Sequence, residues 1–97
     1  MPAYIILNKL TEQGVRTIKD TTKRAEASRK AIEAAGGRVI GIWWTQGQYD
    51  SVIILEMPDE MSAMAMLLQT GQQGNIQTQT MRAFSEQDMA GIIGRLP

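Results

Sequence analysis

Seven side chains have the types and positions that could bind a ligand. They are Asn8, Lys19, Arg24, Trp44, Tyr49, Asp50 and Arg82. In the stretch from Gly47 to Asp50, a tyrosine hydroxyl and a carboxylate lie beside a predicted strand, where they could bind a ligand or move a proton. The same residues also suit a tight turn, in which glycine supplies an unusual φ, tyrosine packs and aspartate bonds to the backbone. The sequence leaves both roles open and assigns no catalytic residue.

Three cations lie close together where the first long helix is expected to begin. Lys19, Lys23 and Arg24 would each oppose the helix dipole there by about 0.3 to 1 kcal/mol, so their presence needs a reason. One interpretation is a small anion site, in which Lys19 and Arg24 join the backbone N–H groups of the helix N-terminus. The other is a set of solvated side chains, with Glu26 pairing to Lys30 further along the helix.

The remaining candidates lie within predicted strands or at their ends. Trp43 and Trp44 are adjacent, so they point to opposite faces of a strand: one enters the core and the other faces the open side. The outer ring would join a subunit contact or stack on a planar ligand. Asn8 and Arg82 leave the first and fourth strands at predicted sheet ends, where they face either a cleft or solvent.

Composition argues against several classes of function. The 97 residues contain no histidine and no cysteine, which removes the commonest general base, the commonest transition-metal ligand and any disulfide. We therefore expect no cofactor and no metal. Ten basic and ten acidic residues balance, which argues against nucleic acid or an anionic membrane as a partner. Since no apolar run is long enough to span a bilayer and the start lacks a secretory signal, we expect a cytoplasmic protein.

The apolar pattern predicts four strands and three helices in one domain of residues 1–97. The strands are expected at residues 3–10, 39–45, 49–57 and 75–84. The helices are expected to start at Asp20, Thr21 or Thr22, at Pro58, and after Ser85 in a capping box with Asp88; the first two end at Ala35 and at Gly71 or Gly74. Residues 11–19 are expected to form a loop or a short helical turn that is flexible at Gly14.

Helical spacing also predicts which side chains touch the core. The first set is Val15 and Ile18, followed by the stripe of Ala25, Ser28, Ile32 and Ala35. The second set is Met61, Met64, Ala65 and Leu68. Without cysteine or histidine nearby, the methionines, Met66 included, are interpreted as adaptable core packing rather than as soft-metal ligands or a partner groove.

The order β-α-β-β-α-β-α predicts an α+β, ferredoxin-like βαββαβ fold with an added C-terminal helix. This topology places the first and third strands at the centre of an antiparallel sheet, and both are apolar on their two faces. Val52 to Leu55, for example, are apolar at four consecutive positions. Two helices can cover only one face of such a sheet. The apolar residues on the other face therefore predict a homodimer formed sheet against sheet, or a higher homo-oligomer.

Several motifs together resemble the GYD domain family over nearly the whole chain. They are Tyr4-Ile5-Ile6-Leu7, Leu10-Thr11-Glu12-Gln13-Gly14, Lys19-Asp20 with Arg24, Gly47-x-Tyr49-Asp50, Gly74-Asn75-Ile76 and Arg82-Ala83-Phe84. The resemblance implies a small bacterial or archaeal protein with a ferredoxin-like fold, related to dimeric α/β-barrel proteins and without an established biochemical function. Thr21-Thr22 stands where relatives often carry Ser-Pro, which leaves the capping residue of the first long helix open.

We expect the chain to bind a small molecule, an anion or an apolar metabolite, in a cavity between sheet and helices. One alternative is a cofactor-independent enzyme of the dimeric α/β-barrel type, with Tyr49, Asp50 and Asn8 as its polar groups; it rests on fold analogy. A non-catalytic assembly or regulatory subunit is the other. A pocket of about 300 Å³ or more with a few convergent polar groups would favour a ligand.

Overall fold

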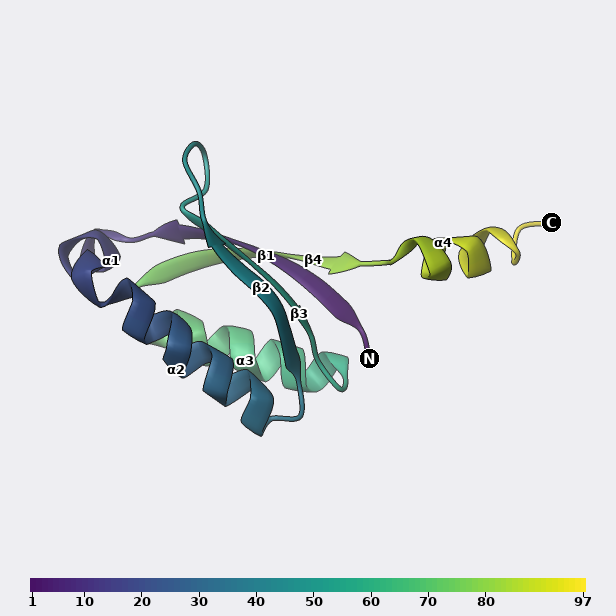
Figure 1. Cartoon of the computed structure of the whole chain (residues 1–97), viewed down its shortest axis with the longest axis horizontal. Helices are drawn as coiled ribbons and strands as arrows, with labels where there is room; N and C mark the ends of the chain where they lie inside the picture. Colours follow the sequence, from purple (N-terminus) through teal and green to yellow (C-terminus); the bar gives the residue numbers. More distant parts are fainter.

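Four antiparallel strands form one sheet in the order β2-β3-β1-β4 in the computed structural model, which describes residues 1–97 (Figure 1). Along the chain the elements are β1 (Ala3–Leu10), α1 (Glu12–Arg16), the 3-10 helix η1 (Ile18–Asp20), α2 (Thr21–Ala34), β2 (Arg38–Trp44), β3 (Ser51–Glu56), α3 (Glu60–Gln72), β4 (Ile76–Ala83) and α4 (Glu86–Ile93). The predicted ferredoxin-like order with an added helix is confirmed, and β1 and β3 are the central strands.

Helices α2 and α3 cover one face of the sheet and leave the other open (Figure 1). Alternation along β1 turns Tyr4 and Ile6 toward the helices, where they pack with Leu55 of β3. The complete core consists of Tyr4, Ile6, Ile32, Leu55, Met57 and Ala63. Only 8 of 97 residues are buried, so one chain alone has a thin core for its length.

Helix α3 turns a different stripe toward the sheet from the predicted one. Its buried residue is Ala63, with Met66 and Leu67 packed beside it, whereas Met61 and Met64 are 85% and 55% exposed. Both stripes have helical spacing, and the small Ala63 lets the helix approach the strands closely. The predicted core role of Met61, Met64 and Leu68 is therefore wrong, and that of Met66 is correct in part.

A side-chain cap begins α3. Asp59 Oδ1 accepts a hydrogen bond of 2.7 Å from the backbone N–H of Ser62, which satisfies one of the free donors of the first turn. This bond lowers the pKa of the Asp59 carboxyl below its usual value because it favours the charged form. In α2, by contrast, the N-cap residue Asp20 makes no side-chain capping bond.

The segment between β1 and α2 is helical rather than a flexible loop. Val15 and Ile18 are 57% and 42% exposed, so the prediction that they touch the core is wrong. The buried residue of α1 is Gly14, whose backbone lies against Asn75. A Cβ at this position would overlap the Asn75 carbonyl oxygen. Gly14 is thus required for close approach and not for flexibility, and its φ is not positive.

Glycines with positive φ lie at three predicted chain reversals. Gly36 (φ 87°) follows α2, Gly47 (φ 113°) lies in the β2–β3 hairpin, and Gly74 (φ 79°) follows α3. The hairpin loop is longer than its apolar flanks predict, because β3 begins at Ser51 and leaves Tyr49 in the turn. Helix α2 ends one residue early, at Ala34, and Ala35 is exposed rather than part of the buried stripe.

The C-terminal helix α4 projects away from the sheet and the other helices (Figure 1). Its predicted capping box is present, since Ser85 Oγ accepts from the Asp88 N–H and the Asp88 carboxylate accepts from the Ser85 N–H. The apolar side chains Met89, Ile92, Ile93 and Leu96 are all exposed. No helix in the chain has the length and apolar character that crossing a bilayer requires.

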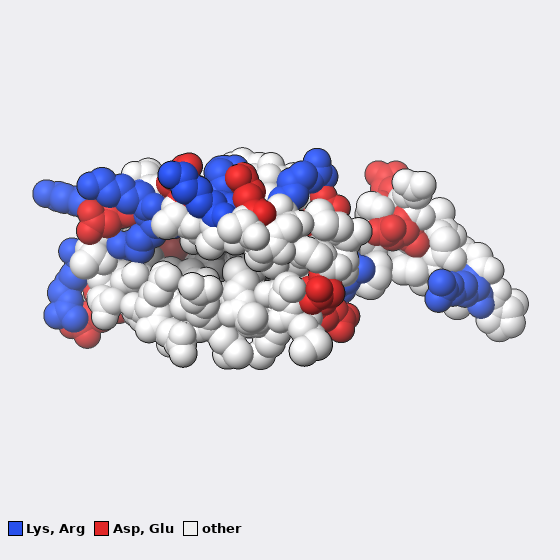
Figure 2. All heavy atoms as spheres, turned by 90° about the horizontal axis from the view of Figure 1, so that it is seen from below, with Lys and Arg blue, Asp and Glu red and all other residues white.

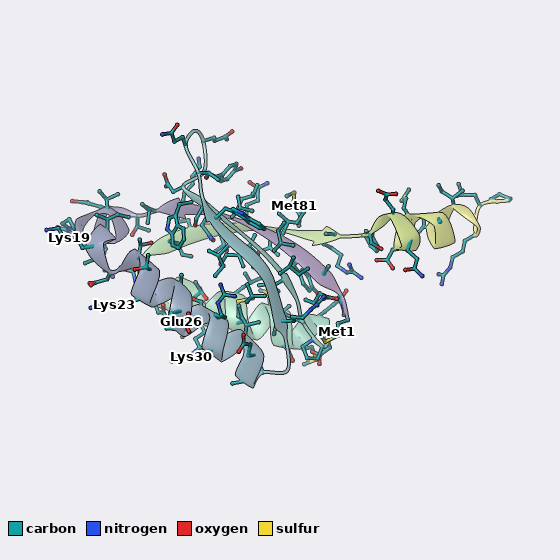
Figure 3. All side chains as sticks on the ribbon, viewed as in Figure 1. Met1, Lys19, Lys23, Glu26, Lys30 and Met81 are labelled. Atoms are coloured by element: carbon teal, nitrogen blue, oxygen red, sulfur yellow. The ribbon has the colours of Figure 1, made fainter.

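The uncovered face of the sheet is apolar over β1, β2 and β3 and at Met81 of β4, whereas Gln77 and Gln79 of β4 make its edge polar. Met81, Ile5 and Ile54 lie side by side in one cross-strand row. Leu7, Val52 and Trp43 form the next row. Figure 3 shows Met81 on the side away from the helices, and this side chain and Trp43 are 41% and 50% exposed. We call this surface the open face.

Candidate functional site

A small cavity of about 70 Å³ lies between the sheet and helices α2 and α3. Its lining residues are Asn8, Leu10, Thr21, Arg24, Ala25, Ser28, Ile42, Trp44, Asp50, Ser51, Ile53, Thr70, Gln73, Asn75 and Ile76. Apolar side chains of the strands form its floor, and polar groups enter from β1, the hairpin and both helices. This volume is well below the roughly 300 Å³ of a typical ligand pocket. It has room for a group of a few heavy atoms.

Asn8 is the most buried polar residue at this cavity, with 2% of its surface exposed. The first strand runs to Leu10 as predicted, so Asn8 lies within β1 rather than leaving it, and alternation turns its side chain toward the helices. Its Nδ2 donates to Ser51 Oγ at 3.1 Å, whereas its buried Oδ1 has no hydrogen-bond partner. Buried polar atoms are rarely left unpaired, so Asn8 Oδ1 is a candidate contact for a ligand or ordered water.

Arg24 turns inward from the first half of α2. Its Nη1 donates to the backbone oxygen and the Oγ1 of Thr17, at 2.9 and 3.1 Å, which fixes the guanidinium plane. Its Nη2 is buried and unpartnered. In contrast, Lys19 and Lys23 point outward to solvent (Figure 3). Of the three cations near this helix start, Arg24 alone lines the cavity.

Asp50 ties the hairpin to β1 at the edge of the cavity. Its Oδ2 accepts from the backbone N–H of Leu10 at 2.7 Å, and its own N–H donates to the Asn8 carbonyl at 2.8 Å. The predicted turn role had Asp50 bonding to backbone within the turn, whereas its side chain bonds to the backbone of β1; Gly47 does supply the predicted unusual φ. Because Asp50 also lines the cavity, it adds a carboxylate to the space that Asn8 and Arg24 line.

A second hollow leads outward between α2 and α3. This groove has a volume of about 260 Å³ and shares Arg24, Ser28, Thr70 and Gln73 with the inner cavity. Figure 2 shows the hollow between the charged surface of α2 and the largely uncharged surface of α3. The shared residues place the two spaces next to each other, so the groove is the route by which a small molecule would enter.

The structure brings together four of the seven predicted site residues, Asn8, Arg24, Trp44 and Asp50. Trp44 faces the helix side, where its Nε1 donates to Thr21 Oγ1 at 3.0 Å, and Trp43 lies on the open face. Lys19, Tyr49 and Arg82 do not line this cavity.

Tyr49 and Arg82 lie at separate places. The Tyr49 hydroxyl donates to Gln79 Oε1 on the open face, and Lys9 lies over its ring. Arg82 lies near the start of β1, with its guanidinium against the rings of Tyr4 and Phe84. Of the three polar groups proposed for an enzyme, Asn8 and Asp50 share the cavity, whereas Tyr49 contacts the opposite face of the sheet.

Sequence reasoning did not identify six further polar residues that line the cavity. They are Thr21, Ser28, Ser51, Thr70, Gln73 and Asn75. Ser28 carried a usable signal, because it is a polar residue within the stripe predicted to face the sheet. For Ser51 the signal is its pairing opposite Asn8, which depends on the register of β1 and β3. No cluster of three or more acidic side chains capable of holding a metal ion is present.

Comparison with known proteins places this chain in a family. The model of the GYD domain matches residues 4–93. The chain belongs to the GYD domain family. A GYD-type relative from Thermus thermophilus is 29% identical over 97 residues, spanning 99% of both chains, and is named "Glutamine synthetase and cystathionine beta-lyase binding protein". No solved structure gives a significant match.

Motifs by which this GYD domain resembles its family contact one another at the cavity end of the sheet. Thr11 Oγ1 donates to the Gly74 carbonyl at 2.6 Å, and the Thr11 N–H donates to the Asn75 carbonyl at 3.0 Å. Gln13 Nε2 donates to Asn75 Oδ1 at 2.9 Å. Together with the bond from Leu10 to Asp50, these contacts hold the end of β1 and the start of β4 beside the cavity.

Proposed function

We propose that this GYD-domain protein is a non-catalytic, homo-oligomeric binding protein that holds a small anionic group in the cavity between its sheet and helices. One observation carries the proposal: Arg24 Nη2 is a buried donor without a partner, in a residue that lines this cavity. Asn8 Oδ1, a buried acceptor at the same cavity, also lacks a partner and would accept from any donor on the bound group. An anionic oxygen would accept from Nη2 in a charge-assisted bond, which is about twice as strong as a neutral one.

The cost of leaving these atoms unpaired supports a bound group. A buried polar atom without a partner costs about 1 to 3 kcal/mol, and more if it is charged. Arg24 could have extended into solvent as Lys23 does, yet its guanidinium is held inward by Thr17. A binding role fits the geometry better than catalysis, because the Tyr49 hydroxyl contacts the opposite face of the sheet from Asn8 and Asp50.

The first test is thermal stabilisation by small anions and its loss in Arg24→Met. At about 100 times Kd, a ligand stabilises the folded state by about 2.7 kcal/mol. For a chain of this size this corresponds to a rise in Tm of about 10 °C or more. We expect formate, acetate or propionate to give such a rise in the wild type, and Arg24→Met to abolish it. Differential scanning fluorimetry at constant ionic strength measures both.

Lys23→Met is the matched control, because it removes one positive charge from the same helix at an outward-facing position. It should keep the full stabilisation. Formamide, the uncharged analogue of formate, should have no effect on Tm. If no carboxylate, phosphate or sulfate raises Tm above formamide, the cavity holds water and the proposed anion site is wrong.

The homo-oligomeric part of the proposal is supported by the open face. Ile5, Ile54 and Val52 are half-buried there, and no helix of their own chain covers them. Soluble monomers rarely expose a continuous apolar area of several hundred Å². A second copy is the occupant we propose, because the same face on a second subunit would be equally apolar and a two-fold contact brings like surfaces together.

A second candidate function, binding to partner enzymes, is favoured by a different surface. The Thermus thermophilus relative is named for binding glutamine synthetase and cystathionine beta-lyase. On this chain, Met61, Met64 and Leu68 form an exposed apolar stripe along α3, on the side of the molecule opposite the open face. A methionine-rich stripe suits a protein partner, since its flexible side chains adapt to the surface they meet. We propose that this stripe contacts such enzymes.

This proposal predicts that Met64→Lys weakens binding by about tenfold or more, because a charge would be buried in an apolar contact. The measurement is biolayer interferometry against recombinant glutamine synthetase and cystathionine beta-lyase from the source organism of this chain. Gln69→Lys places the same charge on the same helix beside the stripe and should leave affinity unchanged. Equal losses in both variants, or no binding by the wild type, would contradict a role for the stripe.

A further inference from the structure

The cavity carries charges of both signs, and this narrows the chemistry of its ligand. We infer that it binds the zwitterionic head of a free α-amino acid, with the carboxylate on Arg24 and the ammonium group between Asn8 and Asp50. The inference rests on the proposed anion site and goes further, because it assigns the second half of the ligand.

The carboxylate end follows from Arg24. Nη1 is already occupied by Thr17, and Nη2 is the buried guanidinium nitrogen that lacks a partner and can face a ligand. The hydroxyl-bearing residues Ser28 and Thr70 line the same space. Thr70 Oγ1 donates to the Met66 carbonyl at 3.0 Å and therefore keeps only its lone pairs free, whereas Ser28 retains a donor. The anionic end therefore lies nearest α2.

The ammonium end follows from Asn8 and Asp50. Asn8 Nδ2 donates one of its two hydrogens to Ser51 Oγ, and the buried Oδ1, which has no partner, offers an acceptor to the cavity. Asp50 adds a carboxylate from the hairpin, held in place by the Leu10 N–H. A simple carboxylic acid would leave Asn8 Oδ1 unpaired and bring a second negative charge near Asp50. An adjacent ammonium group would satisfy both acceptors and cancel the repulsion.

The volumes fit a small head with a longer tail. The inner cavity of about 70 Å³ accommodates only a few heavy atoms. The groove of about 260 Å³ that shares Arg24 and Ser28 continues outward between Ala31, Met66 and Gln69. A head group common to all amino acids would occupy the inner space, and the side chain would extend into the groove.

The structure supplies a direct optical probe for this cavity. Trp44 lines it, whereas Trp43, the other of the two tryptophans, lies on the open face. In Trp43→Phe, fluorescence therefore reports on the cavity residue alone. Titration of this variant with L-alanine, propionate and ethylamine compares the complete head with the head lacking its ammonium group and the head lacking its carboxylate.

We expect L-alanine to bind about tenfold to hundredfold more tightly than propionate, and ethylamine to bind most weakly. In Trp43→Phe combined with Asp50→Asn, the advantage of L-alanine over propionate should shrink to less than about threefold. Asparagine retains an oxygen that can accept from the Leu10 N–H but has no charge, so the variant should still fold. Isothermal titration calorimetry on the folded variant then measures the effect of the lost charge on ligand affinity.

The possible outcomes are distinguishable. If propionate binds as tightly as L-alanine, the zwitterion inference is wrong and the proposed anion site stands; a carboxylate held by Arg24 and a turned Asn8 amide would give this result. If ethylamine binds and propionate does not, or if no probe binds, both the inference and the proposed anion site are wrong. Unchanged preference in the Asp50→Asn variant also overturns the assignment of the ammonium end.

Discussion

Replacing Gly14 with alanine is expected to destabilise the fold by about 3 kcal/mol, at the upper end of the usual cost of overpacking. The new Cβ would overlap the Asn75 carbonyl oxygen and lie 3.1 Å from Leu10 Cδ2. The Asn75 carbonyl oxygen belongs to the backbone and is not free to move, whereas the Leu10 Cδ2 atom is the end of a flexible side chain. The Asn75 oxygen accepts the Thr11 N–H at 3.0 Å, and the backbone of Leu10 is bonded to Asp50. Urea unfolding followed by far-ultraviolet circular dichroism measures the loss.

Gly71→Ala is the matched control, since it makes the same change inside helix α3 at a position with no heavy atom within 4 Å of the new Cβ. Alanine has the higher helix propensity, so this variant should gain about 0.5 to 1 kcal/mol. Opposite signs for the two glycines would show that close approach at Asn75, rather than backbone freedom, determines the cost. A loss below about 1 kcal/mol for Gly14→Ala would contradict this account.

Gly14 also shows what kind of feature sequence patterns miss. A glycine between a strand and a helix is typical of a flexible point, and the chain alone does not indicate that Asn75, 61 positions later, packs against it. The same limit applies to α3. Two apolar stripes of equal period compete for the sheet, and only packing against β1 and β3 selects Ala63, Met66 and Leu67. Strand order and strand faces were predictable because period-two alternation is local.

The candidate site was predictable in part for a related reason. Asn8, Arg24, Trp44 and Asp50 stand out as polar or aromatic residues where the pattern predicts strands, turns and a helix start. Their convergence depends on register, which pairs Asn8 with Ser51 across β1 and β3. Tyr49 separates from Asp50 because the two side chains leave the hairpin turn on opposite sides of the sheet. Spacing along the chain alone does not indicate which of the two reaches the cavity.

The proposed oligomer predicts that Ile54→Lys raises its dissociation constant by about 100-fold or more. Ile54 lies in the central row of the open face, opposite Ile5 on the neighbouring strand. In a two-fold contact each substitution occurs twice, so two uncompensated charges would be buried, at a cost of more than about 1.4 kcal/mol each. In a lone subunit the same lysine reaches solvent, so the fold should persist. Analytical ultracentrifugation at micromolar concentration measures the mass, and circular dichroism checks the fold.

Leu68→Lys is the control for added charge alone, because this residue lies on α3, on the side of the molecule opposite the open face, and is 59% exposed. It should leave the wild-type mass unchanged.

The isolated helix α4 is a second reason to expect an oligomer, since an eight-residue helix containing Gly91 is too short to persist in water without packing. Its exposed Ile92 and Ile93 therefore have the same need for a second subunit as the open face. A wild-type mass of 10.7 kDa at micromolar concentration would show that neither surface is covered in this way.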